Sequence, residues 1–339
     1  MGITRAKAPL RISFCGGGTD VSPYLEERGG VVLSATIDRY AYASLRPKRG
    51  AGLTVHSLDY GITITQDIRK TMRLDGNLDL VKAAVNRMNL RKTDQGIEMY
   101  LHVDAPPGSG LGSSSTLVVA VLAAIARRKR IPMTGYEIAE LAYRVERIDL
   151  GIRGGKQDQY SAAFGGFNFI EFHRDATIVN PLRLDLETTN ELEYSLLLLN
   201  IGGTRLSARI IEKQVRNYTD RKPEVLTAMD ELKRITIDMK NALLRGRLSD
   251  FGDLLHHAWW NKKRMADTIT NPKIDELYET ARKKGALGGK ITGAGGGGHM
   301  ILFCPFDRKH KIRESLEKAG ACIIPFHLEP FGVQSWVTS

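Results

Sequence analysis

The feature that most limits the fold of this 339-residue chain is a glycine- and serine-rich segment that leads directly into an apolar run. Gly108, Gly110 and Gly112 alternate with other residues, three serines follow, and residues 117–126 are all apolar. The apolar run predicts a buried helix, and the first turn of a helix has backbone N–H groups without partners. Such a terminus favours an anion, and glycine lets the main chain approach it closely. We therefore predict a phosphate-binding loop, with a plain serine-capped glycine turn as the alternative.

This loop differs from two common nucleotide-binding motifs. No lysine follows the glycines, so it is not a Walker loop. Nothing like a six-strand parallel unit follows either, which argues against a dinucleotide-binding fingerprint. The hydroxyl groups of the three serines suit phosphate oxygens or a magnesium ion.

The composition argues against a disulfide-rich, a membrane-spanning or a secreted protein. The hydrophobic fraction of 42% is ample for a packed core. Cys15, Cys304 and Cys322 are too scattered for a disulfide framework or a metal site. The longest apolar run has ten residues, whereas a membrane span needs about twenty. The first twenty residues do not have the pattern of a secretion signal. We expect a cytoplasmic protein that does not bind membranes.

The chain is basic, with a formal net charge of +11. Such a charge serves solubility, or attracts small anions or nucleic acid. Basic residues are spread along the chain apart from Arg127–Arg130, which is typical of a solvated helix end. No aromatic-rich basic motif is present, so we expect no nucleic-acid partner.

Periodic patterns place strands and helices in both halves. The expected strands are 31–45, 53–65, 96–103, 164–172, 194–201 and 299–303, with a last strand pair after 319. The expected helices are 78–89, 134–150, 204–215, 223–244, 250–269 and 308–319, besides the apolar helix after the glycine loop. The polar run 187–193 predicts a connection, so the domain boundary is placed near 185, between domains 1–185 and 186–339. The class is α+β or α/β in two halves.

Glu146 is a candidate metal ligand on the helix that begins at Thr134. Glu137 completes a capping box with Thr134. The apolar stripe of this helix comprises Ile138, Leu141, Ala142, Val145 and Ile148. Glu146 lies beside the stripe, and a carboxylate at the edge of a buried face needs a partner. A metal ion is one such partner, and a nearby arginine is the other.

Three further segments are candidates for the functional site. Asp158 lies in a glycine-bounded loop, where it would ordinarily be a turn residue. The segment 8–20 puts Arg11 on a strand and Asp20 after a glycine turn. A second glycine loop, 290–299, precedes a strand. Two such loops can flank one ligand between two domains, although a flexible connector fits the second loop equally well.

Together these segments resemble the GHMP kinases, the superfamily of galactokinase, homoserine kinase, mevalonate kinase and phosphomevalonate kinase. The motifs APLRISFCGGGTD, PPGSGLGSSS and KITGAGGGGHMILF match in order across nearly the whole chain. The resemblance implies an α+β fold with a ribosomal-S5-like N-terminal domain, which has a left-handed β-α-β unit, and a ferredoxin-like C-terminal domain. It also implies an ATP-dependent phosphotransferase that uses Mg²⁺.

The resemblance assigns roles to individual residues. Asp158 matches the catalytic aspartate, Arg11 the basic residue facing it, and Ser114 and Glu146 the magnesium ligands. The implied ATP-binding residues are Pro107, Gly108, Ser109, Gly110, Leu111, Gly112, Ser113, Ser114 and Ser115. The implied substrate-binding residues are Gly17, Gly18, Thr19, Asp20, Gly295, Gly296 and Gly297.

The GGGTD stretch of the first motif, together with GGKQDQYSAAFGGFNFIEF at residues 154–172, most resembles family members that act on D-glycero-D-manno-heptose 7-phosphate. Galactokinase has a Glu and a His where this chain has Gly17 and Gly18, so we expect open space for a longer sugar with a distal phosphate. Arginine suits phosphate, and Arg153 and Lys156 are the first candidates, with Arg205 behind them. The implied reaction is phosphorylation of the anomeric hydroxyl to give the 1,7-bisphosphate. Another sugar 1-kinase of the fucokinase or galactokinase type, a non-catalytic nucleotide- or RNA-binding protein on this fold, and a homodimer all stay open.

Overall fold

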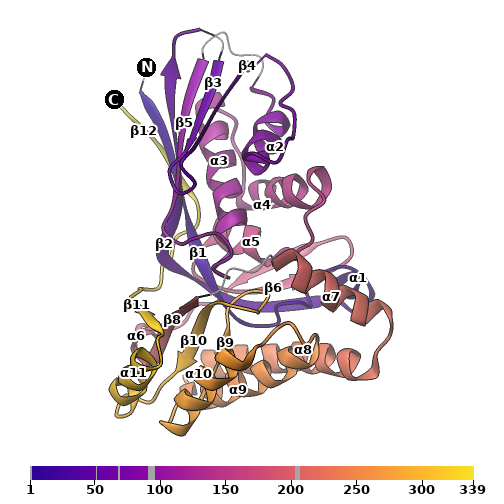
Figure 1. Ribbon diagram of the computed structural model, residues 1–339, viewed down its shortest axis with the longest axis vertical. Coiled ribbons are helices and arrows are strands. Elements are labelled where there is room, and N and C mark those ends of the chain that lie inside the picture. Colours follow the sequence, from indigo (N-terminus) through magenta and orange to yellow (C-terminus); the bar gives the residue numbers. More distant parts are fainter. Residues whose placement is uncertain (1, 51, 68, 91–95, 203–206) are drawn as a thin grey trace.

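The computed structural model describes residues 2–50, 52–67, 69–90, 96–202 and 207–339. In this part of the chain a large sheet with its helices forms one half of the molecule, and a small sheet with a layer of helices below it forms the other (Figure 1). None of the described helices combines the length and the apolar character needed to cross a bilayer.

The large sheet has eight strands. They are β1 (Ile3–Cys15), β2 (Gly30–Lys48), β3 (Gly52–Ser57), β4 (Ile62–Asp67), β5 (Gly96–Val103), β6 (Phe167–Phe172), β7 (Thr177–Pro181) and β12 (Gln334–Thr338). The order is β12-β1-β2-β5-β3-β4. Strand β6 pairs with residues 30–35 of β2, whereas β5 pairs with residues 41–48, and β7 pairs with β6. Only the β3–β5 pair is parallel among the described pairs. The expected strand 53–65 is the hairpin β3–β4, because residues 58–61 form a turn.

One face of this sheet holds a buried helix. The helices are α1 (Tyr24–Arg28), α2 (Asp79–Arg87), α3 (Ser113–Lys129), α4 (Gly135–Arg144) and α5 (Gln157–Phe164), with the π-helix η2 (Val145–Asp149) after α4. Helix α3 packs on β1 and β2 and is surrounded by α2, α4 and α5 (Figure 1). Its residues from Val118 to Ala126 are all buried, which confirms the expected buried helix.

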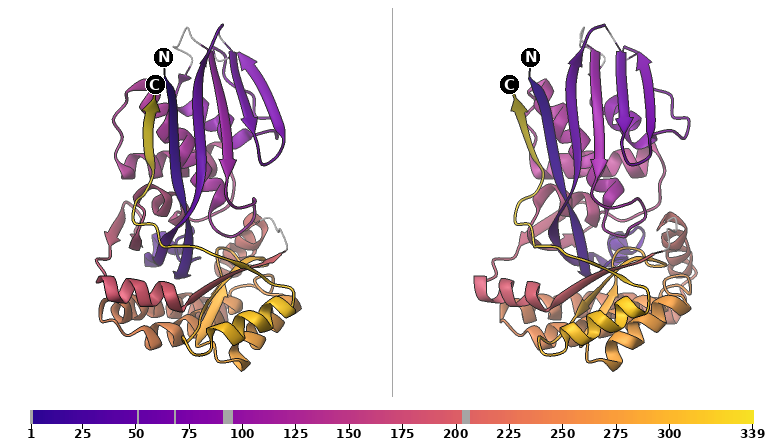
Figure 2. Two further views of the ribbon diagram at one scale, coloured as in Figure 1. Left: turned by 90° about the vertical axis from the view of Figure 1, so that its left-hand side faces the viewer. Right: turned by 60° about the vertical axis from the view of Figure 1, so that its left-hand side comes forward.

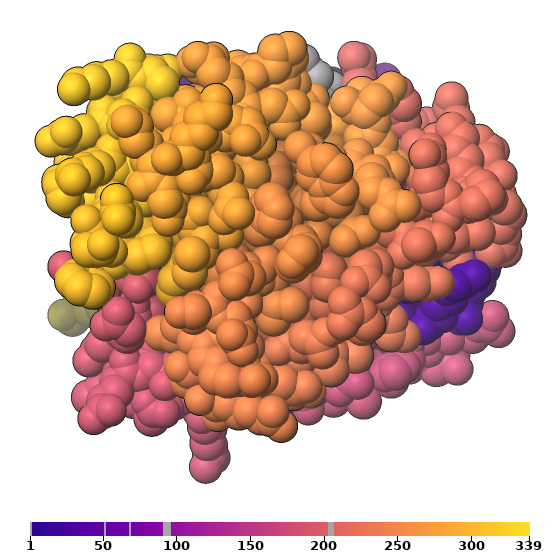
Figure 3. All heavy atoms as spheres, turned by 90° about the horizontal axis from the view of Figure 1, so that it is seen from below, coloured from indigo at the N-terminus to yellow at the C-terminus, as the bar shows by residue number. Residues whose placement is uncertain are grey.

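The small sheet comprises β8 (Leu196–Gly202), β9 (Gly288–Ile291), β10 (Gly298–Phe303) and β11 (Cys322–Ile324). Its order β11-β8-β10-β9 is antiparallel throughout and is that of a ferredoxin-like sheet. The helices are α6 (Leu186–Ser195), α7 (Ser207–Thr219), α8 (Pro223–Leu244), α9 (Leu248–Arg264), α10 (Pro272–Lys283) and α11 (Lys309–Lys318). Seen from below, this half makes up most of the surface, with a small indigo patch of N-terminal chain (Figure 3).

Two local expectations were wrong. Residues 187–193 lie in helix α6, which Asp185 caps by accepting the amide of Thr188. The expected α-helix 134–150 ends at Arg144 and continues as a π-helical turn. A π turn adds a residue per turn, so the side chains in it are rotated about the helix axis relative to an α-helix. Ile148 is therefore 66% exposed rather than in the core.

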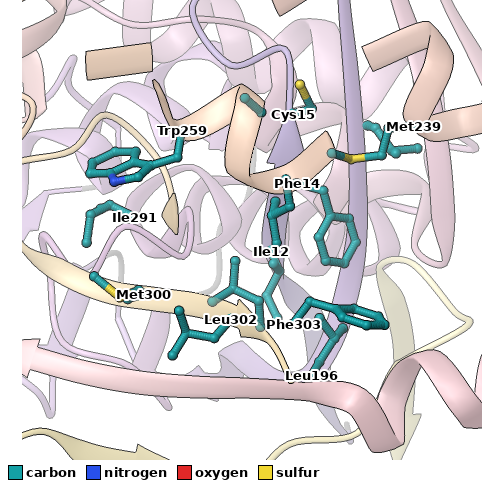
Figure 4. Packing of buried hydrophobic residues seen from close by; sticks show 14 of the residues in the cluster. Ile12, Phe14, Cys15, Leu196, Met239, Trp259, Ile291, Met300, Leu302 and Phe303 are labelled. Atoms are coloured by element: carbon teal, nitrogen blue, oxygen red, sulfur yellow. The ribbon is translucent and has the colours of Figure 1, made fainter. Parts of the chain in front are cut away.

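The two halves share a core along β1. Leu10, Ile12 and Phe14 pack into the cluster that includes the small sheet. Phe14 meets Phe251 edge-on with ring centroids 5.3 Å apart, and Figure 4 shows Ile12 and Phe14 among residues of the other half. Side chains alternate along a strand, so Arg11 and Ser13 point away from this cluster.

The last strand returns to the first sheet, where β12 lies beside β1 (Figure 2). The chain therefore begins and ends in the same sheet, although the boundary expected near 185 falls between β7 and α6. The division into domains 1–185 and 186–339 stays a prediction.

Candidate active site

The glycine loop before α3 is held against the loop between β9 and β10. Gly108, Gly110 and Gly112 have φ angles of 75°, 78° and 80°, which side chains disfavour. A Cβ on Gly110 would lie 2.5 Å from the Thr292 carbonyl oxygen. His299 Nδ1 contacts the Ser109 carbonyl at 2.8 Å, and burial lowers the pKa of His299, so the neutral ring donates from Nδ1. Residues of both glycine loops line one cavity, and the expectation that they flank one ligand stays a prediction.

The start of α3 presents unpaired amides to a cavity. The first intrahelical bond runs from the Thr116 amide to the Gly112 carbonyl at 2.9 Å, so the amides of Ser113, Ser114 and Ser115 have no partner within the helix. No acidic side chain lies in this turn. Of the expected ATP-binding residues, Pro107, Gly108, Gly110, Gly112 and the three serines line the cavity. Ser109 and Leu111 are buried, and Leu111 belongs to the core.

Asp158 lies beside this loop, on the first turn of α5. Arg11 donates to its Oδ1 from Nε at 2.9 Å and from Nη2 at 2.6 Å. Arg11 also donates from Nη1 to the Gly110 carbonyl at 2.6 Å. The Asp158 carboxyl carbon lies 3.4 Å from the Cβ position of Gly112, which places the carboxylate directly beside the glycine loop. The arginine therefore fixes the carboxylate against the phosphate loop.

Glu146 is a buried carboxylate at the serine end of the cavity. It is 2% exposed, and burial raises its pKa. The Gln159 amide donates to Glu146 and, at 3.2 Å, to Ser115 Oγ. The arrangement joins Glu146 to Ser115, while Ser114 lines the cavity from an exposed position.

The oxygen-rich donor set fits a magnesium ion. Glu146 and the serine hydroxyls are hard oxygen donors, and magnesium is commonly held by one or two carboxylates together with phosphates. The buried Gln159 Oε1 has no hydrogen-bond partner in the described part of the chain, so this polar pocket has acceptor capacity to spare. The assignment of Ser114 and Glu146 as magnesium ligands stays a prediction.

Asp20 lines the same cavity and is held by two backbone amides. It is buried, and it accepts the Gly18 amide at 2.8 Å and the Gln157 amide at 3.1 Å. Thr19 is buried and stabilises the turn. Its hydroxyl accepts the Val31 amide at 3.0 Å, and its single proton lies within reach of the carbonyls of Gly16 and Val31, at 2.8 and 2.9 Å. Asp20 is therefore presented by a turn that its own neighbours stabilise.

The space expected at Gly17 and Gly18 is filled. A Cβ on Gly17 would lie 3.1 Å from Gln157 Nε2. A Cβ on Gly18 would lie 2.6 Å from Met265 Cε and 3.2 Å from Lys262 Nζ. The expectation of open space was wrong, because side chains from α5 and α9 occupy the room that the two glycines leave.

Two buried lysines near the site, Lys262 and Lys290, were not expected from the sequence. Both are buried lysines of the C-terminal half that donate to the first motif: Lys262 to the Gly17 carbonyl at 2.8 Å, and Lys290 to the Ser13 carbonyl at 2.8 Å. Lys262 lines the cavity. Lys262 lies among charged and apolar residues on an ordinary amphipathic helix. Only its burial, which the sequence does not show, distinguishes it from a surface lysine.

The remaining expected substrate residues are dispersed. Arg153 lines the cavity from an exposed loop. Lys156 Nζ lies 4.7 Å from the ring centroid of Tyr143. In the described part of the chain, Lys156 does not line the cavity. Arg205 lies outside the described residues. In the third loop Gly293 and Ala294 line the cavity, whereas Gly295 and Gly296 pack on Ile269, so the substrate role of Gly295, Gly296 and Gly297 stays a prediction.

The cavity lies between the halves and has a volume of about 350 Å³. A second, largely apolar cavity of about 410 Å³ adjoins it at Ser113 and Ser114. Leu80, Val81 and Leu117 are among its walls. An apolar pocket next to an anion-binding loop suits a ligand with a flat base and a phosphate tail.

Comparisons with known proteins agree with this geometry. Residues 79–166 match the family profile of the GHMP kinases N terminal domain, and residues 239–322 match that of the GHMP kinases C terminal. A D-glycero-alpha-D-manno-heptose 7-phosphate kinase of Campylobacter jejuni is 38% identical, over 98% of each chain. A bifunctional fucokinase/GDP-fucose pyrophosphorylase of Arabidopsis thaliana is 27% identical, over 93% of this chain and 31% of its own.

Solved structures show the same likeness. The crystal structure of a D-glycero-D-manno-heptose 1-phosphate kinase from Bacteriodes thetaiotaomicron has a TM-score of 0.84 and 34% identity. It covers 99% of both chains. The likeness therefore extends over both sheets and the cavity between them.

Proposed function

This chain belongs to the GHMP kinases, and on that premise we propose that it transfers the γ-phosphoryl group of ATP to the anomeric hydroxyl of D-glycero-D-manno-heptose 7-phosphate. The product is the 1,7-bisphosphate. The chain is a phosphotransferase, as its relatives are kinases that act on sugar phosphates. The observation that carries the proposal is Asp158, fixed by Arg11 beside the phosphate loop in the cavity between the halves.

The donor side of the cavity would bind ATP through main-chain groups. The amides of Ser113–Ser115 and the α3 dipole would bind the phosphates, and the apolar cavity would take the base. No lysine follows the glycines, so the backbone would provide the positive potential that a Walker lysine supplies elsewhere. The charge that develops on the leaving phosphate would be stabilised by groups already in place.

On the acceptor side, Asp158 would orient the anomeric hydroxyl. Arg11 occupies Oδ1, which leaves Oδ2 to accept from the sugar and to receive the proton late in the transfer. Phosphoryl transfer passes through a loose transition state, so positioning and charge stabilisation outweigh proton abstraction. Asp20, which also lines the cavity, would bind sugar hydroxyl groups.

Magnesium belongs to this proposal as a cofactor. Glu146 and the serine hydroxyls, Ser114 foremost, would hold it, and when bound it neutralises charge on the β- and γ-phosphates. The buried carboxylate would carry its negative charge more readily beside a cation, because burial alone raises its pKa.

An ADP-release assay with magnesium-ATP tests the proposal. The acceptors are heptose 7-phosphate, other sugar 7-phosphates and free hexoses, including fucose and galactose, with Asp158→Asn as the blank. We expect turnover on the heptose 7-phosphate, with a kcat/KM at least about tenfold above that on any free hexose. Turnover on free hexoses alone would overturn the heptose assignment and leave a sugar kinase of another kind.

A further inference from the structure

Lys262 is a buried cation in an uncommon setting. It lies on α9, is 3% exposed and lines the cavity beside Asp20. Its ammonium group donates to the Gly17 carbonyl at 2.8 Å and to Gln214 Oε1 at 3.2 Å. Across the described residues it forms no ion pair within 4.0 Å of a carboxylate. A buried charge without such a partner is costly, which indicates a use for it.

The donor count leaves one position for a ligand. An ammonium group has three N–H donors, and Gly17 and Gln214 take two of them. The third is available to an oxygen in the cavity. Gly18 makes this approach possible, because a Cβ there would lie only 3.2 Å from Lys262 Nζ.

We propose that Lys262 donates a hydrogen bond to an oxygen of the acceptor sugar next to the one that Asp20 binds. The ammonium and the carboxylate then form a donor–acceptor pair for neighbouring hydroxyl groups of a polyol. Asp20 comes from the N-terminal half and Lys262 from the C-terminal half, so acceptor recognition requires both. The inference rests on the proposed function in one respect, that the acceptor is a sugar.

The charge of Lys262 responds to pH in an accessible range. Burial lowers its pKa to about 8, while Asp20 and Cys15 act in the opposite direction. Lys290 on β9 is the second ammonium nearby, and Arg11 adds positive charge beyond it. Above about pH 8 the amine of Lys262 is neutral and keeps two N–H donors, which Gly17 and Gln214 already occupy. The bond to the sugar is then lost.

Steady-state kinetics of the full chain test this directly. Lys262→Met and Lys262→Arg are compared with Lys263→Met, the adjacent residue of α9, which contacts Asp275 at 3.3 Å instead. We expect Lys262→Met to raise the KM of the acceptor about tenfold or more, as for loss of a hydrogen bond to a charged group, with the KM of ATP within about twofold. Lys263→Met should resemble the wild type.

The pH dependence of the acceptor KM provides a second test, and its wild-type measurement does not depend on the folding of a variant. Its acceptor KM should rise above about pH 8, and that rise should disappear in Lys262→Arg, because arginine stays charged. A flat wild-type profile, or an equal rise in both KM values for Lys262→Met, would overturn the proposal. The acceptor is whichever sugar supports ADP release, so failure of the heptose assignment is distinguished from failure of this inference. Turnover on no sugar would overturn both.

Discussion

Arg11 directs two N–H donors at a single oxygen of Asp158, at 2.9 and 2.6 Å, and a third at the Gly110 carbonyl at 2.6 Å. One side chain thus ties the carboxylate to the phosphate loop. The arginine is 3% exposed and the aspartate 23%, so the partly open side of the pair is the carboxylate. Asp158 therefore lies beside the loop that we propose to bind phosphate, and the first prediction concerns the charge of its carboxylate.

Asp158→Asn should lower kcat by about 100-fold or more, within the range of general-base catalysis. The KM of ATP should change little, because the amides of α3 are untouched. Asn keeps an oxygen that can accept from Arg11, so the fold should persist. The matched control is Asp149→Asn, since Asp149 is also held by an arginine, Arg87, but outside the cavity. A kcat near the wild-type value would remove Asp158 from the mechanism.

Glu146→Gln should separate stability from metal dependence. Burial raises the pKa of Glu146, so the folded state holds a proton that the unfolded state has already released, and stability falls as pH rises between the two pKa values. Glutamine does not titrate, so the stability of Glu146→Gln does not fall for this reason. Its free energy of unfolding relative to wild type should therefore be more favourable at pH 7 than at pH 4, as urea titrations can measure.

The same variant should need more magnesium for half-maximal activity. Glu140→Gln, on the neighbouring helix α4, is the control because Glu140 pairs with Arg144 at the surface. An unchanged magnesium requirement in Glu146→Gln would argue against a metal role for this carboxylate.

Gly110→Ala should be more harmful than Gly320→Ala. Both glycines have positive φ, 78° and 86°, and alanine in that region costs about 1–2 kcal/mol. At Gly110 the new Cβ would also lie 2.5 Å from the Thr292 carbonyl, whereas at Gly320 no atom of the described residues lies within 4 Å. Thermal unfolding should show a larger loss at Gly110, together with a higher KM for ATP. Equal losses would mean that the two glycine loops do not hold each other in place.

Lys290 should make the protein more stable as the pH rises above neutrality. Burial lowers its pKa to about 7, so the folded state releases a proton that the unfolded state still binds, up to the ordinary lysine range. Stability then rises with pH between those values, by at most about 1.4 kcal/mol per pH unit for one proton. Lys290→Met should show a shallower rise in urea unfolding from pH 7 to 9. Parallel slopes for the two proteins would contradict this.

The parts of the site that the sequence predicted are those set by local chemistry. The alternation of glycines before α3 matches three positive φ angles, because only glycine adopts them freely. The capping box of Thr134 and Glu137 is present, and the buried helix after the loop is where the apolar run lies. Each of these depends on neighbours a few residues away.

The parts that the sequence could not predict depend on distant contacts. Helix α6 covers a polar run that resembles a connection, and the π-helical turn at Glu146 moves Ile148 to the surface. Gln157 and Lys262 fill the room beside Gly17 and Gly18 from other elements. Nothing in the local pattern of an amphipathic helix distinguishes Lys262 from the lysine that follows it, so its role emerges only when the halves are brought together.

The proposed function depends most on one interaction, in which bare main-chain amides at the start of α3 bind the phosphates of ATP between the two halves. A crystal structure with magnesium and a non-hydrolysable ATP analogue measures this directly. We expect the triphosphate within hydrogen-bonding distance of the Ser113–Ser115 amides, with its last phosphate facing Asp158. A triphosphate bound elsewhere, with those amides left to water, would contradict it.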